Sequence, residues 1–486
     1  MRKFKLSLVL LTITFTNLIY AQQGINRKEK ALIIEKYKKR SKNHQFTKSE
    51  LNVIYNYLKN MDPKKADKAC LEINKRVPTT KEIKERRKKR IREKSRFQRN
   101  SAINTTPINL PSDARFPGEF EEIQGVFVSY PYRANTLMVS EESDGSPSIS
   151  KFFRELIYAI QEAGVKAYIN VRSQADIALL TQHFQEKGTP ISNYEFLINP
   201  TDSFWTRDSG PINFYYGADD RIGWVDLNYY TGRDNDDNLT PLWAQRFDIQ
   251  YSYMPVEFEG GNMLMNGQQT LTTSDRVYEA NSTYTKSEID QILKNSFNLD
   301  NLHVLKALNY DGGTGHVDLY IDMLNENRFV YTKQPTEMAN IPNYDDYQSV
   351  LDNVDYLSTQ TSPAGTNKPY TFGTVPFPTR DDGSVYNNRF EIDGTNRTYS
   401  NHLIVNKTII QPVFNNGKSG NIAGDNSSLV KIRQAYPGYN IIQIDGRVLE
   451  GAGGSIHCVT KEFHAENPVR FKHYAYTGQI DNCQSS

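Results

Sequence analysis

Short apolar runs alternate with helical repeats of apolar residues along most of the chain after residue 115. Apolar runs of four to seven residues predict buried strands at 125–130, 165–171, 328–331, 402–405, 408–411 and 440–444. Apolar positions at helical spacing, each series ended by a glycine, predict helices at 152–163 and 175–187. Strands interleaved with helices in this way indicate the α/β fold class. We find no repeat with a clear sequence period.

Two stretches interrupt this alternation. Residues 343–398 are polar and rich in Asp, Asn, Thr, Pro and Tyr, so we expect a long surface loop inserted into the domain. A boundary falls near 101–115, where SAINTTP leads into LPSD. We therefore divide the chain into an N-terminal segment at 22–105 and a larger domain at 106–486.

The first 21 residues have the pattern of a secretory signal peptide. Arg2, Lys3 and Lys5 form a charged start, and the following run to Ile19 is mostly apolar. Ala21 completes a small-residue cleavage site. A membrane anchor is the alternative, but the run is short and interrupted by polar residues. We expect export to the periplasm, the cell surface or the medium.

The net charge of +2 conceals a strong asymmetry. Residues 22–100 carry 26 Lys/Arg against 9 Asp/Glu, whereas the residues beyond 100 carry 29 Lys/Arg against 47 Asp/Glu. Helical spacing at 31–34 and 51–58 predicts that the basic segment is mainly helical. Such a segment suits nucleic acid or an anionic surface. An exported protein rarely meets nucleic acid, so we favour a solvated arm or a pro-segment lying on the acidic domain, with anionic surface contact as the alternative.

Three cysteines occur, at 70, 458 and 483. Cys458 ends the sequence GGSIHC, where small residues leave room for a substrate, although a lone cysteine is more often buried packing. Export would allow a disulfide, and Cys70 with Cys483 is the only pairing that leaves Cys458 free. The sequence does not establish that these two residues are close.

Four polar clusters lie upstream of Cys458 at predicted strand ends or turns. They are WTRDSGP at 205–211, EGGN at 259–262, GHVD at 315–318 and YSNH at 399–402. His316 and Asp318 are two residues apart, so on a strand leading into 319–323 both would point to the same face. Carboxylates suit a planar guanidinium, which donates paired hydrogen bonds to them. A thiol beside a cation and a histidine is expected to have a lowered pKa and to act as a nucleophile.

These clusters, in this order, resemble the Porphyromonas-type peptidylarginine deiminase family, which also contains the agmatine deiminases. The resemblance covers about 110–465 and is most specific at AYPGYNIIQIDGRVLEGAGGSIHCVT (435–460). It implies a five-bladed α/β propeller with the site at its central pore. It also implies a guanidine substrate, with no metal and no cofactor. The sequence does not indicate an oligomeric state.

The resemblance implies a role for each matched residue. Cys458 matches the nucleophile, His316 the acid/base, and Asp208 and Asp318 the carboxylates that bind the guanidinium nitrogens. The remaining matches are a carboxylate that orients the histidine, a polar residue on the substrate side and an aromatic that lines the site: Glu259, Asn401 and Trp205.

The predicted function is that of a secreted deiminase that converts arginine in peptides or proteins to citrulline and ammonia. The alternative is an agmatine deiminase, which forms N-carbamoylputrescine and ammonia in putrescine biosynthesis. Export favours the first, yet the region that would bind a terminal carboxylate, 229–237, offers only Arg233 as a cation. A catalytically inactive secreted binding protein is the alternative of another class, and amidino transfer to an amine is the least favoured.

Overall fold

The structure is a computed structural model that describes residues 107–131, 148–189, 192–229, 232–362, 368–414, 419–466 and 468. The predicted signal peptide at 1–21, the basic segment at 22–105, Cys70 and Cys483 lie outside the described residues. Among the helices that are described, none is long and apolar enough to cross a membrane.

One strand order recurs in five sheets: the first strand is antiparallel to the second, and the second is parallel to the third. In the second sheet along the chain the strands are β4 (Ile212–Tyr216), β5 (Arg221–Asn228) and β6 (Tyr251–Glu257). The next three sheets are β7 (Leu264–Met265), β8 (Thr270–Ser274) and β9 (Asn301–Leu305); β10 (Ile321–Asn325), β11 (Arg328–Lys333) and β14 (Thr371–Pro376); and β15 (Leu403–Val405), β16 (Thr408–Val413) and β17 (Asn440–Asp445).

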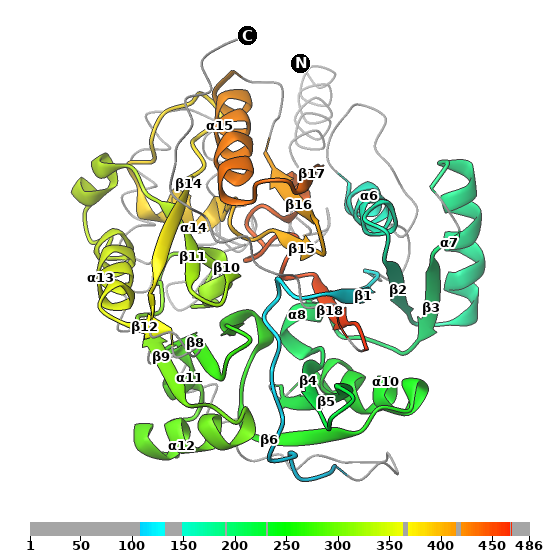
Figure 1. The fold of residues 1–486 in the computed structure, drawn as a ribbon. Helices are drawn as coiled ribbons and strands as arrows, with labels where there is room; N and C mark the ends of the chain where they lie inside the picture. The colour runs from blue at the N-terminus through cyan, green and yellow to red at the C-terminus, as the bar shows by residue number, and fades with distance from the viewer. Residues whose placement is uncertain are drawn as a thin grey trace, which may run out of the picture.

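The two ends of the domain complete one sheet together. β1 (Ile123–Ser129) runs parallel to β2 (Lys166–Val171), which is followed by β3 (Tyr194–Ile198). The last strand, β18 (Thr460–His464), is antiparallel to β1 and supplies the first strand of the motif. The five sheets therefore lie around a common centre, with β18 beside β1 (Figure 1).

Helices connect the second and third strands of each motif, and several of them also contact a neighbouring sheet. α6 (Ile149–Glu162) contacts its own β1 and β2 as well as β16 and β17, and α12 (Lys286–Ser296) contacts both β6 and β9. The remaining helices are α7 (Gln174–Glu186), α8 (Thr206–Ser209), α9 (Asp234–Asp237), α10 (Leu239–Phe247), α11 (Arg276–Ala280), α13 (Asp346–Ser358), α14 (Arg389–Thr395) and α15 (Ser419–Ala435). The 3-10 turns are η2 (Gly260–Asn262), η3 (Val317–Leu319), η4 (Thr336–Asn340) and η5 (Arg447–Leu449).

α6 shows how the sequence forms these elements. The Ser148 side chain accepts a hydrogen bond from the backbone N–H of Lys151 and caps the helix start. One face buries Phe152, Phe153, Leu156, Ile157 and Ile160 against β1, β2 and β17. Full burial of a side chain of this size contributes about 1.5–3 kcal/mol. The apolar face therefore joins the first sheet to the fifth.

The α/β class is confirmed, and each predicted strand and helix of the opening pattern corresponds to an element within a few residues. The expected loop at 343–398 is wrong, because this region contains α13, the short strands β12 (Thr361–Ser362) and β13 (Lys368–Pro369), β14 and α14. β14 is a partly exposed edge strand, and α13 buries polar Asp346 and Asn353 beside Val350 and Leu357. Their apolar patterns are therefore too weak to predict them.

Candidate active site

The polar clusters occupy equivalent places in the five sheets, just before the first strand of each motif. Cys458 precedes β18, Asp208 lies on α8 before β4, and Asn401 precedes β15. Glu259 and η2 precede β7, while His316 and η3 precede β10. Because first strands take the same place in every sheet, the loops before them meet at the common centre. Segments that are 57 to 140 residues apart thereby contact one another.

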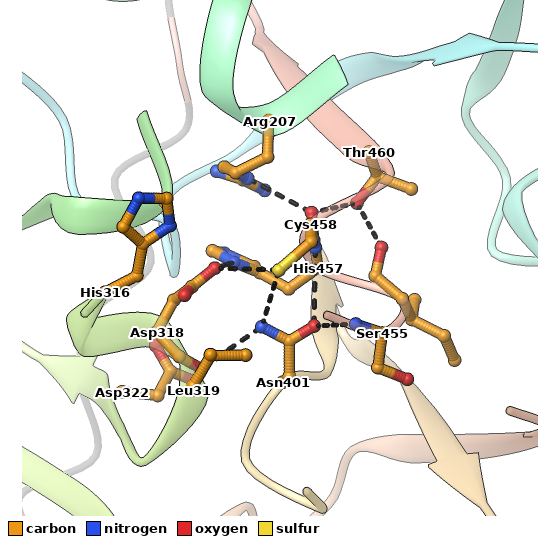
Figure 2. A network of polar contacts seen from close by, with 12 residues as sticks. Arg207, His316, Asp318, Leu319, Asp322, Asn401, Ser455, His457, Cys458 and Thr460 are labelled. Atoms are coloured by element: carbon orange, nitrogen blue, oxygen red, sulfur yellow. Dashed lines mark hydrogen bonds and ion pairs between the residues drawn. The ribbon is translucent and has the colours of Figure 1, made fainter. Parts of the chain in front are cut away.

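The Cys458 thiol is buried between two polar side chains (Figure 2). The Asn401 amide donates to Cys458 Sγ at 3.2 Å, and the thiol lies 3.4 Å from Asp318 Oδ2. The side-chain oxygen of Asn401, Oδ1, accepts from the backbone N–H groups of Ser455 and Cys458 at 2.8 and 3.3 Å. Asn401 therefore holds both the thiol and the loop that carries it.

The thiol does not have the lowered pKa that the sequence suggested. Burial, together with the carboxylates of Asp318 and Asp208, raises the pKa of Cys458 well above its ordinary value. Burial is the larger cause, and the acids near the sulfur add to it. A cation that enters between these carboxylates would stabilise the thiolate and reverse the effect.

His316 is buried and lies between two acids. Its Nε2 is 3.1 Å from Glu259 Oε2, and its Nδ1 is 3.7 Å from Asp208 Oδ1. Burial disfavours the charged ring, but Asp208 and Glu259 outweigh burial and raise the pKa of His316 to about 9. His316 caps η3, so the expectation that it shares a strand with Asp318 is wrong. The two residues instead reach the centre from one tight turn.

Asp208 binds a proton more readily than an ordinary surface carboxylate. Burial raises its pKa to about 7; His316 opposes this rise, while Glu259 and Asp318 add to it. Its Oδ1 accepts from the backbone N–H of Gly261 at 3.1 Å. A Cβ on Gly261 would lie 2.6 Å from His316 Nδ1 and 2.8 Å from Asp208 Oδ1. Only glycine at 261 leaves both groups in place.

Asp318 is ionised more readily. Burial alone would raise its pKa, but a hydrogen bond from His457, followed by the charges of His316 and Arg207, lowers it. His457 Nδ1 lies 2.8 Å from Asp318 Oδ2. Asp318 Oδ1 is buried, and no partner for it is found among the described residues. One oxygen of Asp318 is therefore held by the protein, and the other is available to a donor.

A layer of charged groups behind Asp318 was missed from the sequence. His457 Nε2 is 2.6 Å from Glu119 Oε2, and Arg207 Nη1 is 2.8 Å from Glu119 Oε1 and 2.7 Å from Glu462 Oε2. Arg207 also donates through Nε to the carbonyl oxygen of His457. Chain adjacency was the available signal, because His457 precedes Cys458 and Arg207 precedes Asp208. Nothing in the sequence links either of them to Glu119.

Trp205 and Arg233 lie at the edge of this arrangement. Trp205 is half-buried, and a Cβ on Gly454 would lie 2.9 Å from its Cζ3 and 2.7 Å from Cys458 Sγ. The indole ring therefore packs beside the loop that carries Cys458. Arg233 lies at the start of α9, and its Nη1 is 3.5 Å from Asp236 Oδ2. Its charge is thus at least partly engaged by a neighbouring carboxylate.

The arrangement joins a thiol, a cationic imidazole and three carboxylates through direct contacts; Asp208 and Asp318 are buried, and Glu259 is partly exposed. Carboxylates bind a planar cation that carries several N–H donors, the thiol supplies a nucleophile, and the imidazolium supplies a proton. The described residues include no group of three or more His, Cys, Asp or Glu side chains that could hold a metal ion.

Comparisons with known proteins agree with this chemistry. The family model described as Porphyromonas-type peptidyl-arginine deiminase matches residues 115–463. The agmatine deiminase of Stutzerimonas stutzeri is 23% identical over 292 residues, which cover 54% of this chain and 74% of that protein. The agmatine deiminase of Enterococcus faecalis, solved catalyzing its reaction, has a TM-score of 0.59 at 20% identity, covering 74% of this chain and 99% of that chain. At this identity the likeness shows a shared fold.

Proposed function

Because the chain belongs to the Porphyromonas-type peptidyl-arginine deiminase family, whose members are hydrolases of C–N bonds in linear amidines, we propose that it hydrolyses a guanidinium group with Cys458 as nucleophile. One observation carries the proposal. The thiol lies 3.4 Å from Asp318, whose other oxygen is buried and has no hydrogen-bond partner within the described part of the chain, and Asp208 and His316 contact each other on the adjoining loops. A guanidinium held by the two aspartates would present its carbon to the sulfur.

The reaction follows from these contacts. The positive charge of the substrate offsets the carboxylates that raise the pKa of the thiol, so that Cys458 ionises when the substrate enters. The thiolate forms a bond to the guanidinium carbon, and the imidazolium of His316 protonates the departing nitrogen, which leaves as ammonia. Neutral His316 then accepts a proton from water as the water oxygen bonds to the same carbon. Cleavage of the C–S bond releases the ureido product and the cysteine.

Among substrates, we favour agmatine over arginine in peptides. The relatives named above are agmatine deiminases, and a buried thiol suits a slender aliphatic cation. Arg233, the one cation expected to bind a terminal carboxylate, pairs with Asp236, which weakens the case for a carboxylate-bearing substrate. Peptidyl-arginine remains the second candidate, since the predicted export would bring the protein to external peptides.

A substrate panel tests the activity. The purified protein is incubated with agmatine, free arginine, and peptides with internal or C-terminal arginine, and ammonia and ureido product are measured. We expect agmatine to give the highest kcat/KM and Cys458→Ala to lose at least about 10⁴-fold in rate. Activity on peptides alone would establish the second candidate. No turnover of any guanidine would favour an inactive binding protein, and unchanged activity in Cys458→Ala would refute the mechanism.

The roles of the other parts of the chain belong to the same proposal. The fivefold recurrence of one strand order supports a five-bladed propeller. We propose that residues 1–21 direct export and that 22–105 form a helical arm against the acidic domain or an anionic surface. Removal of 22–100 should leave the chemistry intact and change solubility or surface attachment. A folded but inactive truncated protein would show instead that this segment belongs to the site.

A further inference from the structure

His457 lies directly behind Asp318, on the side away from His316, and the proposed reaction gives it no role. Figure 2 shows its ring beside the Asp318 carboxylate, next to the cysteine in the chain. Its Nδ1 is 2.8 Å from Asp318 Oδ2, and its Nε2 is 2.6 Å from Glu119 Oε2. The ring is buried, with 3% of the residue exposed. The imidazole is therefore fixed between two carboxylates with little access for water.

The partners of His457 determine its protonation. Ionised carboxylate oxygens only accept hydrogen bonds, so both contacts are satisfied in full only when both ring nitrogens carry protons. Burial and the guanidinium of Arg207 oppose this charge, but Glu119 and Asp318 outweigh them and raise the pKa of His457 to about 9. Glu119 is in turn held by Arg207, which also pairs with Glu462. Asp318 itself faces two further groups, the Cys458 thiol and His316.

The contact with His457 also orients the Asp318 carboxylate. Oδ2 accepts from His457 and lies 3.4 Å from the thiol, whereas Oδ1 is buried and has no partner among the described residues. If the carboxylate turned, both the hydrogen bond from His457 and the contact with the thiol would be lost. Oδ1 is thus the oxygen that remains for an N–H group of a substrate.

We propose that His457 is a positioning residue that keeps Asp318 ionised and turned so that its second oxygen faces the substrate, with Glu119 holding His457 in this state. The inference rests on the proposed guanidine hydrolysis and deepens it. His457 does not touch the reacting atoms; it acts through Asp318. Without its charge, Asp318 would be a buried carboxylate beside a second acid, Asp208, and would bind a proton more readily.

Three variants separate charge from geometry. In His457→Asn the side-chain amide can still donate to Asp318 but carries no charge, and Glu119→Gln keeps the length of the side chain while removing the acid that holds His457. His303→Asn is the matched control, because His303 is also buried, on β9, but its ring contacts the hydroxyl groups of Tyr356 and Tyr370 instead of carboxylates. Circular dichroism confirms that each variant is folded.

The first readout is the pH dependence of kcat/KM for the best guanidine substrate. In the unchanged protein Asp208, with a pKa of about 7, sets the acid limb. Without the charge of His457, Asp318 resembles Asp208, a buried carboxylate beside a second acid, and must lose its proton in the same range. We therefore expect the acid limb of His457→Asn to become steeper and its midpoint to move up by about one pH unit. KM should rise about tenfold while kcat changes less, because Asp318 binds the substrate in the ground state as well. Glu119→Gln should shift in the same direction by less, and His303→Asn should keep the profile of the unchanged protein. An unshifted acid limb in a folded His457→Asn protein would overturn the proposal.

The second readout needs no substrate. A folded-state pKa of about 9 means that the native protein holds a proton on His457 that the unfolded chain releases above about pH 6.5. This contribution to the free energy of unfolding is complete below pH 6.5 and is lost as the pH rises to 9. We expect His457→Asn to reduce the pH slope of stability in this window, measured by chemical denaturation, by about one proton. Equal slopes would overturn the His457 proposal alone, whereas absence of turnover in the unchanged protein would overturn the proposed function and this inference with it.

Discussion

Asp208 and Asp318 are both buried carboxylates at one centre, yet their pKa values move in opposite directions. The pKa of Asp208 rises to about 7, and that of Asp318 falls below its ordinary value. Burial raises both, so burial cannot explain the difference. Asp208 lies 3.7 Å from the ring nitrogen of His316, and the negative charge of Glu259 repels its carboxylate. Asp318, in contrast, accepts a hydrogen bond from His457 at 2.8 Å. The charged partner decides which acid is ionised.

This difference divides the site into two halves. In the Asp318 half, Asp318, His457 and Arg207 form a charge network that stays ionised through neutral pH, and Glu119 contacts both His457 and Arg207. The Asp208 half, with His316 and Glu259, can exchange a proton near neutrality. A site that must hold a cation and also move protons needs both kinds of carboxylate.

Replacing each aspartate by asparagine should produce the largest difference between the two halves. Asp318→Asn removes the acid that both His457 and the thiol contact, and we expect kcat/KM to fall about 10³-fold or more, with marked loss of stability because the buried His457 is left with Glu119 as its one acidic contact among the described residues. Asp208→Asn should cost about 10²-fold, since Asp208 is already protonated in part near neutral pH.

Steady-state kinetics and chemical denaturation measure both effects of the aspartate variants. Equal losses of activity and stability in the two variants would show that the halves do not differ in function.

Gly261→Ala tests whether the spacing between Asp208 and His316 matters. The added Cβ would lie 2.6 Å from His316 Nδ1, so the ring must shift or rotate. We expect kcat/KM to fall about 10- to 100-fold, because a displacement of about 1 Å disturbs the reacting geometry. Gly373→Ala on β14 is the control, since its Cβ would lie 3.0 Å from the side chain of Val330, with its next neighbours at 3.8 and 3.9 Å. Full activity in a folded Gly261→Ala protein would contradict the assigned geometry.

The pH profile should show the Asp208 half directly. With a pKa of about 7 for Asp208 and about 9 for His316, kcat/KM should rise with pH through 7 as the carboxylate ionises and fall above 9 as the imidazolium loses its proton. One pH unit below the acid limb, the rate should be about tenfold lower. In Asp208→Asn the limb near pH 7 should disappear. A limb that persists unchanged in that variant would assign it to another group.

Part of this organisation could be predicted from the sequence. Strands such as 125–130 carry strong apolar runs, and the polar clusters that hold Asp208, His316 and Cys458 stand out beside glycines. The apolar pattern could not predict the recurrence of five sheets, which only the family resemblance implied, since the units share hydrogen-bond order and not a sequence period. α13 and β14 were missed because each buries few apolar residues.

The charge network behind the site was missed for a different reason. His457 and Glu119 are 338 residues apart and are joined only because β18 closes the first sheet beside β1. Because His457 and Arg207 are next to Cys458 and Asp208 in the chain, the sequence brings them close to the site. The protonation of Asp318, however, depends on groups that come together only when β18 pairs with β1. The sequence therefore indicates which acids are present and not which of them is charged.

Arg233→Gln should have the smallest effect, because Arg233 belongs to neither half. Its guanidinium pairs with Asp236 at 3.5 Å, and Asp236 also accepts from the backbone N–H groups of Asp202 and Ser203, just before Trp205. Removing the positive charge should leave Asp236 in place through these hydrogen bonds, and kcat/KM for agmatine should change less than about threefold.

The same variant assayed with free arginine and with a C-terminal arginine peptide gives the informative comparison. A loss of kcat/KM confined to these carboxylate-bearing substrates would make Arg233 a recognition residue and would favour peptidyl-arginine over agmatine. Equal small changes for all three substrates would mean that Arg233 acts only on the loop that carries Trp205.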